Sequence, residues 1–301
     1  MKILLTGAKG LVGSTISADI KISGRNQVDL TNWENTYSFF KETRPEAVIH
    51  AAARVGGLGA NMNDLAGFYR DNILINTNVL EAARKTGVKR VVSFLSTCIF
   101  PAKVEYPITE DQIHLGEPHS SNFGYAYAKR MLEVHSRAIA TQYGLNYTCV
   151  IPTNIYGPHD NFNLETSHVL PALIHKCYLA KRDKTDLVVW GSGNPLREFI
   201  FSEDVGKLTN LICKDYTERE PLILSTSEEI SIREAVETIA DVMGFEGAII
   251  FDDSKPDGQV RKPTSNAKLK SFVSDYEFTS FYDGIKKTVD WFIQNYGVCR
   301  K

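Results

Sequence analysis

The chain has 301 residues, which is enough for one large domain or two modest ones with a self-sufficient hydrophobic core. Its 34 basic and 36 acidic side chains are interspersed and give a formal net charge of −2, so the basic face typical of nucleic-acid-binding proteins is not expected. Hydrophobic residues make up 43% and charged residues 23%, which excludes a disordered chain. No apolar stretch is long enough to span a bilayer, and no signal peptide is recognisable. Five scattered cysteines without a Cys-x-x-Cys pair favour reduced thiols and a cytoplasmic location.

In the N-terminal half, short β-branched runs alternate with longer amphipathic runs. The expected strands are Ile3–Leu5, Ile20–Ile22, Ala47–Ile49, Val91–Leu95 and Tyr147–Ile151. The expected helices cover residues 33–43, 64–86 and 125–143, and Gly144 is suited to the left-handed cap of the last one. This alternation predicts an α/β fold of the Rossmann type, a doubly wound parallel sheet with helices on both faces.

Shorter elements, separated by Gly, Pro and Asp clusters, follow in the C-terminal half. The expected strands are Leu187–Trp190, Leu222–Leu224 and Ile249–Phe251, and the expected helices cover residues 169–182, 203–215, 231–243 and 284–296. No repeat or flexible linker is recognisable. We therefore expect a first domain over residues 1–160, to which some later segments return, and a smaller α/β domain, mainly residues 161–301, that packs on it across a cleft.

A glycine loop directly follows the first strand: Gly7-Ala8-Lys9-Gly10-Leu11-Val12-Gly13. Three glycines after an N-terminal strand, at the start of an expected helix, are typical of the loop that binds the pyrophosphate of a dinucleotide. Gly7 permits a tight turn, Gly10 lets the pyrophosphate approach the backbone, and Gly13 allows the helix to pack on the strand. The helix N-terminus would add free N–H groups and its positive dipole end. Only nine residues separate Gly13 from Ser23, so this helix is expected to be barely two turns long.

The residues after the second strand favour NADP over NAD. NAD enzymes place a carboxylate there for the ribose 2′-hydroxyl, whereas this chain has Ser23 and Arg25. Together with Lys9, they can hold a 2′-phosphate by charge-assisted hydrogen bonds. Asp29 and Leu30 are expected to border the adenine. The alternative is a solvated Arg25 that contacts no ligand.

Tyr125 and Lys129 are four residues apart and therefore share one face of the expected helix. Two other Tyr-x-x-x-Lys pairs occur, but only this one is expected near Ser96, at the carboxyl edge where parallel sheets bind their ligands. A Lys129 ammonium beside the phenol is expected to lower the pKa of Tyr125, which makes the phenol a usable proton donor and acceptor. Ser96 is placed to hydrogen-bond a substrate oxygen.

Cys98 and His168 are candidates for proton transfer at carbon. Cys98 follows Ser96 by two positions, and alternation along an extended segment would return it to the same side. A thiol and an imidazole suit the movement of a proton on a carbon next to a carbonyl. The alternatives are a small buried cysteine and a surface histidine with satisfied hydrogen bonds. No spacing of His, Cys and carboxylates fits a zinc site.

Beyond these motifs, the sequence resembles the GDP-L-fucose synthases (GDP-4-keto-6-deoxy-D-mannose 3,5-epimerase/4-reductases) of the extended short-chain dehydrogenase superfamily, over nearly the whole chain. The glycine loop and the Tyr125/Lys129 pair indicate only the superfamily. The narrower segments include Ala51–Gly57, Ser96–Pro101, Pro152–Phe162, Ser167–Lys176, Val189–Gly193, Arg197–Phe199 and Lys255-Pro256-Asp257-Gly258. The shortened first helix departs from the family pattern on the adenine side.

The resemblance implies the chemistry of each catalytic candidate. Cys98 would remove the protons at C3 and C5 of the 4-keto sugar, and His168 would return them on the opposite face. Ser96, Tyr125 and Lys129 would serve the reduction of the C4 ketone by NADPH. A homodimer is also implied, with the helices at 64–86 and 125–143 packed across the two-fold axis.

The implied binding positions fall into two sets. The cofactor set is Gly7, Ala8, Lys9, Gly10, Leu11, Val12, Gly13, Ser23, Arg25, Asp29, Leu30, Ala51, Ala52, Leu95, Ser96, Tyr125, Lys129, Pro152, Asn154, Ile155 and His168. The nucleotide-sugar set is Val55, Ser96, Cys98, Asn154, His168, Lys176, Trp190, Arg197 and Asp257. In the second set, Lys176 and Arg197 suit a diphosphate, and Trp190 offers a flat face for guanine or sugar.

Two other functions remain open from the sequence. The first is another nucleotide-sugar enzyme of the superfamily, such as a 4-epimerase or a 4,6-dehydratase; the dehydratase would need an Asp-Glu pair where Cys98-Ile99 follows Thr97. The second is a non-catalytic NADP-sensing regulator. The intact set of Ser96, Tyr125 and Lys129 argues against it.

Overall fold

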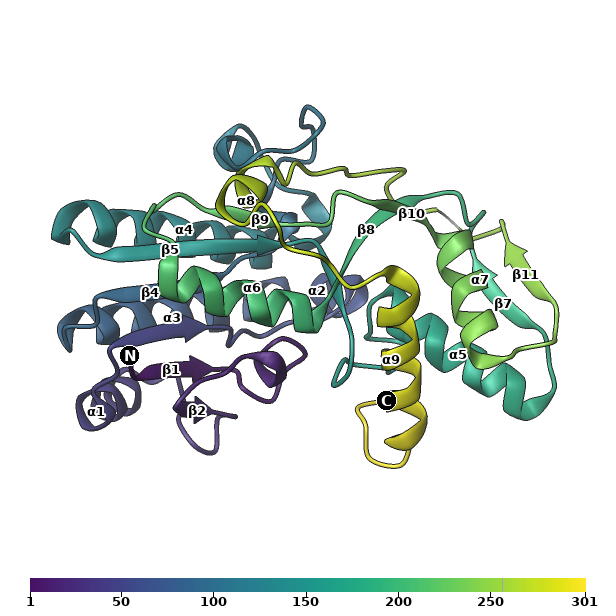
Figure 1. Ribbon diagram of the computed structural model, residues 1–301, viewed down its shortest axis with the longest axis horizontal. Coiled ribbons are helices and arrows are strands. Elements are labelled where there is room, and N and C mark those ends of the chain that lie inside the picture. Colours follow the sequence, from purple (N-terminus) through teal and green to yellow (C-terminus); the bar gives the residue numbers. More distant parts are fainter. Residues whose placement is uncertain (256) are drawn as a thin grey trace.

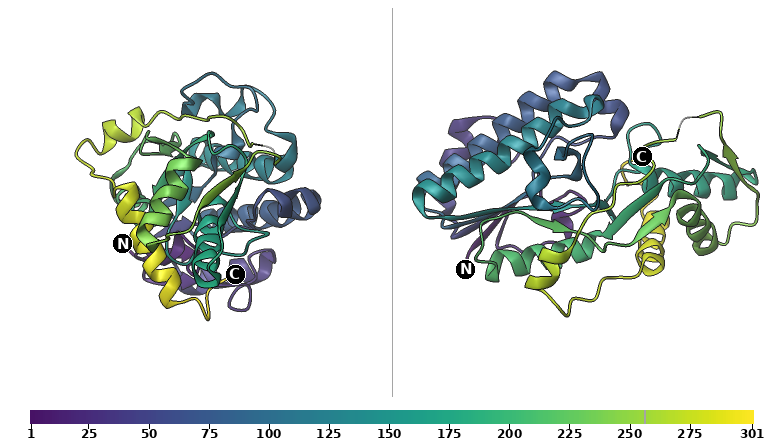
Figure 2. Two further views of the ribbon diagram at one scale, coloured as in Figure 1. Left: turned by 90° about the vertical axis from the view of Figure 1, so that its right-hand side faces the viewer. Right: turned by 90° about the horizontal axis from the view of Figure 1, so that it is seen from above.

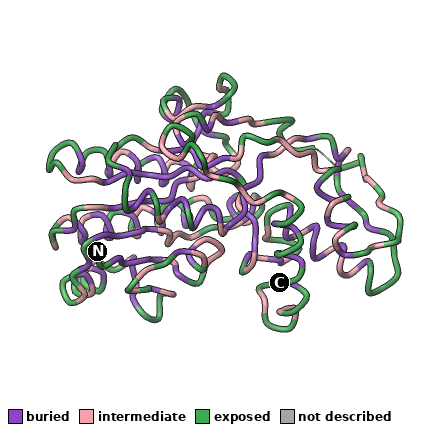
Figure 3. Tube along the Cα trace, viewed as in Figure 1, coloured by how far each residue is buried: buried purple, intermediate pink, exposed green. Residues whose placement is uncertain are grey.

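A six-stranded parallel sheet forms the larger part of the molecule in the computed structural model, which describes residues 1–255 and 257–301 (Figure 1). Its strands, in spatial order, are β2 (Ile20–Ile22), β1 (Ile3–Thr6), β3 (Ala47–His50), β4 (Arg90–Phe94), β5 (Asn146–Pro152) and β9 (Leu222–Leu224). Every neighbouring pair is parallel, so all six strands end at one edge. The buried residues are concentrated along these strands (Figure 3).

Helices cover both faces of this sheet, which confirms the predicted α/β fold. On one face lie α1 (Trp33–Thr43), α3 (Leu65–Lys85) and α4 (Phe123–Tyr143), and on the other lie α6 (Ser202–Asp215) and α8 (Ala267–Phe272). The sheet separates these layers in the right-hand view of Figure 2. Gly144 caps α4 in the left-handed region, with a φ of 68°, as its position predicts.

The smaller part of the molecule contains two short sheets and three helices. The strands are β6 (Asn154–Tyr156), β8 (Leu196–Phe201) and β10 (Glu229–Ser231) in one sheet, and β7 (Leu187–Trp190) and β11 (Ile249–Asp252) in the other. The helices are α5 (Val169–Asp183), α7 (Ile232–Met243) and α9 (Phe281–Gln294), and they enclose a separate apolar core. The chain passes between the two parts repeatedly, so the boundary at residue 160 stays a prediction. No helix in the described part of the chain is long and apolar enough to cross a membrane.

The prediction of a helix after the glycine loop is wrong. Gly13–Thr15 forms a single 3₁₀ turn, η1, and Ile16 is already extended, with φ −91° and ψ 131°. The connection must return at once to β2, because the Asp19 carboxylate accepts a hydrogen bond from the Ile3 amide at 2.8 Å. Ser, Thr and Ile are also weak helix formers. Ile16, which is 2% exposed, packs into the core beneath α6 instead.

Candidate active site

The glycine loop fits a pyrophosphate without a helix behind it. Gly7 has a φ of +77°, and a Cβ there would lie 2.8 Å from the Ala52 amide nitrogen, so only glycine is tolerated. A Cβ on Gly10 would meet only the Gly7 carbonyl oxygen, at 3.3 Å, which leaves its outer face open. Among the described residues, the amides of Lys9, Leu11 and Val12 have no protein acceptor. Free successive amides make an anion site, so the loop itself takes the role expected of the helix dipole.

The residues predicted to bind a 2′-phosphate lie on an exposed turn after β2. The Arg25 Nε atom is 3.4 Å from an Asp29 carboxylate oxygen, and hydrogen bonds from Thr31 hold the pKa of Asp29 below its usual range. The Ser23 amide donates to the Gln27 side chain at 2.9 Å. An exposed ion pair contributes little to stability, so the Arg25 side chain is free to leave Asp29 and bind a ligand.

Lys129 lies on α4 with its ammonium buried at the end of β4, and its charge does not lower the net pKa of Tyr125 as predicted. Its ammonium donates to the Phe94 carbonyl at 2.7 Å and lies 5.9 Å from the centroid of the Tyr125 ring. Burial lowers the pKa of Lys129 to about 8. Burial, and secondarily the neighbouring Cys98, raises the pKa of Tyr125. The expected lowering is wrong because loss of solvation outweighs the charge of an ammonium turned towards a carbonyl.

Cys98 lies next to Ser96, although not by strand alternation. Residues Thr97–Ile99 form a 3₁₀ turn, so the extended segment on which that argument relied is absent there. The turn brings the pair together by capping, since the Cys98 amide donates to the Ser96 hydroxyl at 3.5 Å. Burial raises the pKa of the Cys98 thiol, while Ser96 and the lysines 262 and 129 act in the opposite direction.

Sequence reasoning missed Lys262, whose ammonium donates to the Thr97 carbonyl at 2.7 Å. It stands on an irregular segment 165 positions away in the chain. Neither periodicity nor a motif marks such a long-range contact. Lys262 therefore connects the C-terminal segment to the turn that carries Cys98.

His168 is the N-cap residue of α5, and a close backbone contact joins this segment to the loop after β3. The Gly57 amide donates to the Thr166 carbonyl at 3.0 Å, and a Cβ on Gly57 would lie 2.9 Å from the same oxygen. Val55 in this loop is 62% exposed and free to contact a ligand. The His168 ring keeps access to solvent, but the surrounding protein lowers the pKa of the imidazole.

Four of the predicted nucleotide-sugar residues lie together in the smaller part. The Lys176 ammonium is 4.8 Å from the ring centroid of Trp190, which is 66% exposed. The Asp257 carboxylate accepts hydrogen bonds from the Ser192 amide at 2.9 Å and hydroxyl at 2.7 Å. Arg197 donates to the Gln259 carbonyl at 2.6 Å, next to the same turn. Pro256, within this segment of the resemblance, lies outside the described residues.

Three further predicted positions lie at the end of β5 and directly after it. Asn154 opens β6, is exposed, and donates through its side chain to the Glu198 carbonyl at 2.8 Å. Pro152 is buried at the end of β5, and Ile155 packs on the core beneath α6. They lie next to Leu95, which follows the neighbouring strand β4, at the carboxyl edge of the large sheet.

A buried polar chain, also missed from the sequence, joins β1 to α4. His50 is fully buried, and burial lowers its pKa to about 3, so it is neutral. Its Nδ1 atom lies 2.8 Å from the Thr6 hydroxyl and its Nε2 atom 3.1 Å from the Asn76 side-chain oxygen. Since that oxygen can only accept, Nε2 carries the proton. Asn76 in turn donates to the Ala128 carbonyl at 3.3 Å, one residue before Lys129.

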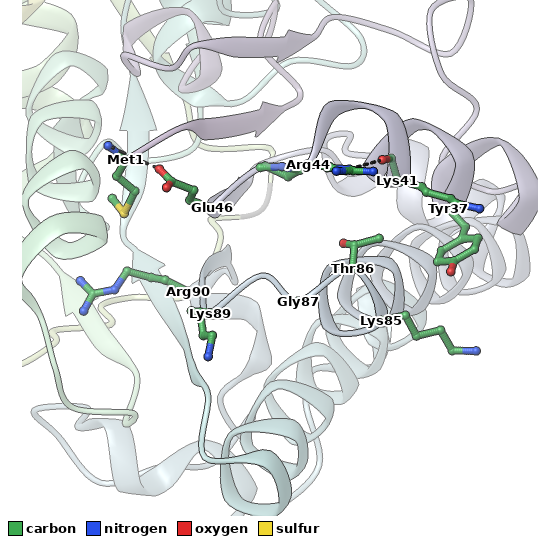
Figure 4. Close-up of a pocket in the computed structure, with 11 residues that line it drawn as sticks. Met1, Tyr37, Lys41, Arg44, Glu46, Lys85, Thr86, Gly87, Lys89 and Arg90 are labelled. Carbon is green, nitrogen blue, oxygen red and sulfur yellow. Dashed lines mark hydrogen bonds and ion pairs between the residues drawn. The ribbon is translucent and has the colours of Figure 1, made fainter.

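A separate cavity of about 700 Å³ lies at the opposite, amino edge of the sheet (Figure 4). It is lined by Met1, Tyr37, Lys41, Arg44, Pro45, Glu46, Lys85, Thr86, Gly87, Lys89 and Arg90. The labelled lysine side chains diverge rather than converge (Figure 4), and they stand near the C-terminal ends of α1 and α3, where cations complement the helix dipoles. The described residues contain no cluster of His, Cys and carboxylates that would hold a metal ion.

Residues 3–223 match the NAD dependent epimerase/dehydratase family. A GDP-L-fucose synthase of Dictyostelium discoideum is 49% identical over 99% of this chain and 97% of its own length, and a probable GDP-L-fucose synthase of Drosophila melanogaster is 46% identical over 100% and 99%. The crystal structure of a GDP-L-fucose synthetase from Naegleria fowleri bound to NADP superimposes with a TM-score of 0.94, at 44% identity over 99% of this chain and 94% of that one. The chain therefore belongs to the NAD dependent epimerase/dehydratase family, in the branch of the GDP-L-fucose synthases.

Proposed function

We propose that this protein converts GDP-4-keto-6-deoxy-D-mannose to GDP-L-fucose with NADPH, by epimerisation at C3 and C5 and then reduction at C4. The observation that carries the proposal is the segment Phe94–Ile99. It brings Ser96 and Cys98 beside Tyr125 and Lys129 at the carboxyl edge of the sheet. The GDP-L-fucose synthases among the relatives and the NADP-bound similar structure support the same reading.

The glycine loop and the turn after β2 would hold the cofactor, which supplies a hydride when bound. The free amides of Lys9, Leu11 and Val12 suit the pyrophosphate. Lys9, Ser23 and Arg25 suit the 2′-phosphate. The chain's other residues supply position and protons.

Epimerisation needs a base and an acid on opposite faces of the sugar. The Cys98 thiolate takes the proton from C3 or C5, and the electron pair moves to the C4 oxygen, to which Ser96 donates a hydrogen bond. The protonated His168 ring returns a proton to the opposite face of that carbon. The raised pKa of Cys98 and the lowered pKa of His168 make both groups neutral at rest, so the reactive forms are a minority at pH 7.

Reduction uses Tyr125 and Lys129. The Tyr125 phenol gives its proton to the C4 oxygen as that carbon is reduced. The Lys129 charge, kept nearby by the Phe94 carbonyl, stabilises the phenolate that forms. Arg197 and Lys176 would hold the diphosphate, and the exposed face of Trp190 would stack on guanine or sugar.

The test is the exchange of the C3 and C5 protons in deuterated water. Cys98→Ser changes volume little but removes a group acidic enough to supply an anion near neutral pH, so deuterium incorporation should be lost while NADPH binding persists. The unepimerised ketone should then be reduced slowly to a 6-deoxy sugar with its original configuration. Cys299→Ser, at another half-buried cysteine, is the matched control. Normal exchange and normal product from Cys98→Ser would refute this role.

We also propose a homodimer that packs through α3 and α4. Large apolar side chains on these helices are exposed: Tyr69, Leu74, Phe123, Met131 and Tyr143. Light scattering should give twice the chain mass, and Leu74→Glu should halve it. A wild-type monomer at micromolar concentration would contradict the dimer.

All five cysteines are unpaired, which supports our proposal of a reducing, cytoplasmic location. Cell fractionation tests it. Recovery of the protein from an oxidising compartment would contradict it.

A further inference from the structure

Cations bind three backbone carbonyls along the segment that carries Cys98. Lys129 donates to the Phe94 carbonyl at 2.7 Å, Lys262 to the Thr97 carbonyl at 2.7 Å, and the Arg130 Nε atom to the Ile99 carbonyl at 2.5 Å. We name Lys129, Arg130 and Lys262 the cation cluster. Two of its members therefore hold the residues directly before and after Cys98.

Arg130 stands out in the cation cluster because, in the described part of the chain, one nitrogen of its buried guanidinium has no hydrogen-bond partner. The side chain is 4% exposed, and its NH1 atom donates to the Gly116 carbonyl at 2.7 Å. Its NH2 atom is buried and, within the described residues, has no hydrogen-bond partner, and no carboxylate pairs with the guanidinium there. A guanidinium stays protonated even when buried. Burying such a charge is costly. Two carbonyls and the Tyr127 ring, whose centroid lies 5.5 Å from the guanidinium carbon, compensate it in part, and an anion formed nearby would gain from the remaining charge.

Cys98 is the group that can gain. Among the described residues, Ser96, Lys129 and Lys262 act on the Cys98 thiol, and the thiol acts on Tyr125 and on Arg130, which is bonded to the next residue, Ile99; none of these groups is a carboxylate. Burial alone favours the neutral thiol, whereas nearby positive charge favours the thiolate. The proposed base thus depends on charge supplied by its surroundings.

Resting on the proposed role of Cys98, we propose that Arg130 is a positioning residue of the epimerisation: its guanidinium holds the Thr97–Ile99 turn, and its unpaired charge favours the Cys98 thiolate. Arg130 does not touch the sugar in this assignment. It acts only through Cys98.

Alkylation of Cys98 tests this without substrate. The rate of iodoacetamide labelling of the full-length protein, followed at the Cys98 peptide by mass spectrometry, gives the midpoint of thiolate formation against pH. Arg130→Gln keeps an amide donor but loses the charge, so the midpoint should rise by about one pH unit, a roughly tenfold slower reaction below the midpoint. Arg130→Lys keeps the charge and should stay close to the wild-type midpoint. As a control, Arg137→Met removes an exposed arginine from the same helix and should leave the alkylation midpoint of Cys98 unchanged.

A second readout connects the effect to catalysis. Deuterium exchange at C3 and C5 should slow in Arg130→Gln with the same upward pH displacement, while the KM for the nucleotide sugar stays unchanged. An unchanged alkylation midpoint in Arg130→Gln, or an equal rise in Arg130→Gln and Arg130→Lys, overturns the proposal. Failure of the proposed function would be seen in a different measurement, since the Cys98→Ser variant would then show normal deuterium exchange at C3 and C5.

Discussion

At the adenine end of the proposed site, the glycine loop leads into a single 3₁₀ turn, and Arg25 has only an exposed ion pair with Asp29. At the reacting end, Lys129 and Arg130 are 2% and 4% exposed, and each is bonded to a backbone carbonyl. The reacting end is therefore organised by buried hydrogen bonds, whereas Arg25 at the adenine end is exposed and held only by a weak ion pair. Substitutions at the reacting end should change reaction rates, and substitutions at the adenine end should change cofactor affinity.

The largest effect is expected at the reacting end. Tyr125→Phe removes the proton donor and preserves shape, so kcat for NADPH oxidation should fall roughly 10²–10⁴-fold. Exchange of the C3 and C5 protons should survive, because it needs the ketone but no hydride. Loss of exchange with substrate binding intact would show that the two reactions do not divide their residues as proposed.

In the glycine loop, two matched substitutions separate folding from binding. A Cβ on Gly13 would run into the Gly7 carbonyl, so Gly13→Ala should lower the free energy of unfolding by about 1–3 kcal/mol. Gly10→Ala brings its methyl group 3.3 Å from the Gly7 carbonyl oxygen, a tight contact without a clash, so it should lower thermal stability much less than Gly13→Ala and should weaken NADPH binding. Equal stability of the two variants, measured by thermal denaturation, would mean that the loop has another conformation.

A smaller effect, confined to affinity, is expected for Arg25→Ala. Loss of a charge-assisted contact made only to the 2′-phosphate should cost ~1.5–3 kcal/mol, seen as a higher KM for NADPH with little change for NADH. Steady-state kinetics with both cofactors provides the measurement. Equal losses with NADPH and NADH would remove Arg25 from the cofactor site.

The smallest effect concerns Asp160, on the loop that precedes His168. Burial raises the pKa of this carboxyl to about 7, above its usual value of 3.8. The folded state therefore retains a proton that the unfolded state loses, and the stability that this proton contributes is present below pH 3.8 and is lost as the pH rises through 7. Asp160→Asn should raise Tm by a few degrees at pH 8 and less at pH 5. A parallel pH dependence of Tm in both proteins would contradict this ionisation.

Most strands and helices of the large sheet can be predicted from hydrophobic periodicity, because the spacing of apolar residues indicates which face of an element is buried. α1, β7 and β9 begin and end at the predicted residues. The helix after Gly13 was mispredicted because the length of a connection, not its glycines, decides whether a helix fits. The glycine loop, Ser96 and the Tyr125/Lys129 pair are local patterns, so a sequence alone can propose them. Lys262, Arg130 and His50 act through contacts that only the folded chain creates.

The repeated passage of the chain between the two parts has a consequence for synthesis. The large sheet lacks its last strand until β9 (Leu222–Leu224) has been made, and α8 (Ala267–Phe272) covers it later still. By then α5, β7 and β8 of the smaller part are already in place along the chain. A nascent chain therefore cannot complete one part before starting the other, in contrast to the unit-by-unit order common for multidomain proteins. Until β9 leaves the ribosome, the growing polypeptide exposes an unfinished sheet edge, and this interval is when it would most need a chaperone.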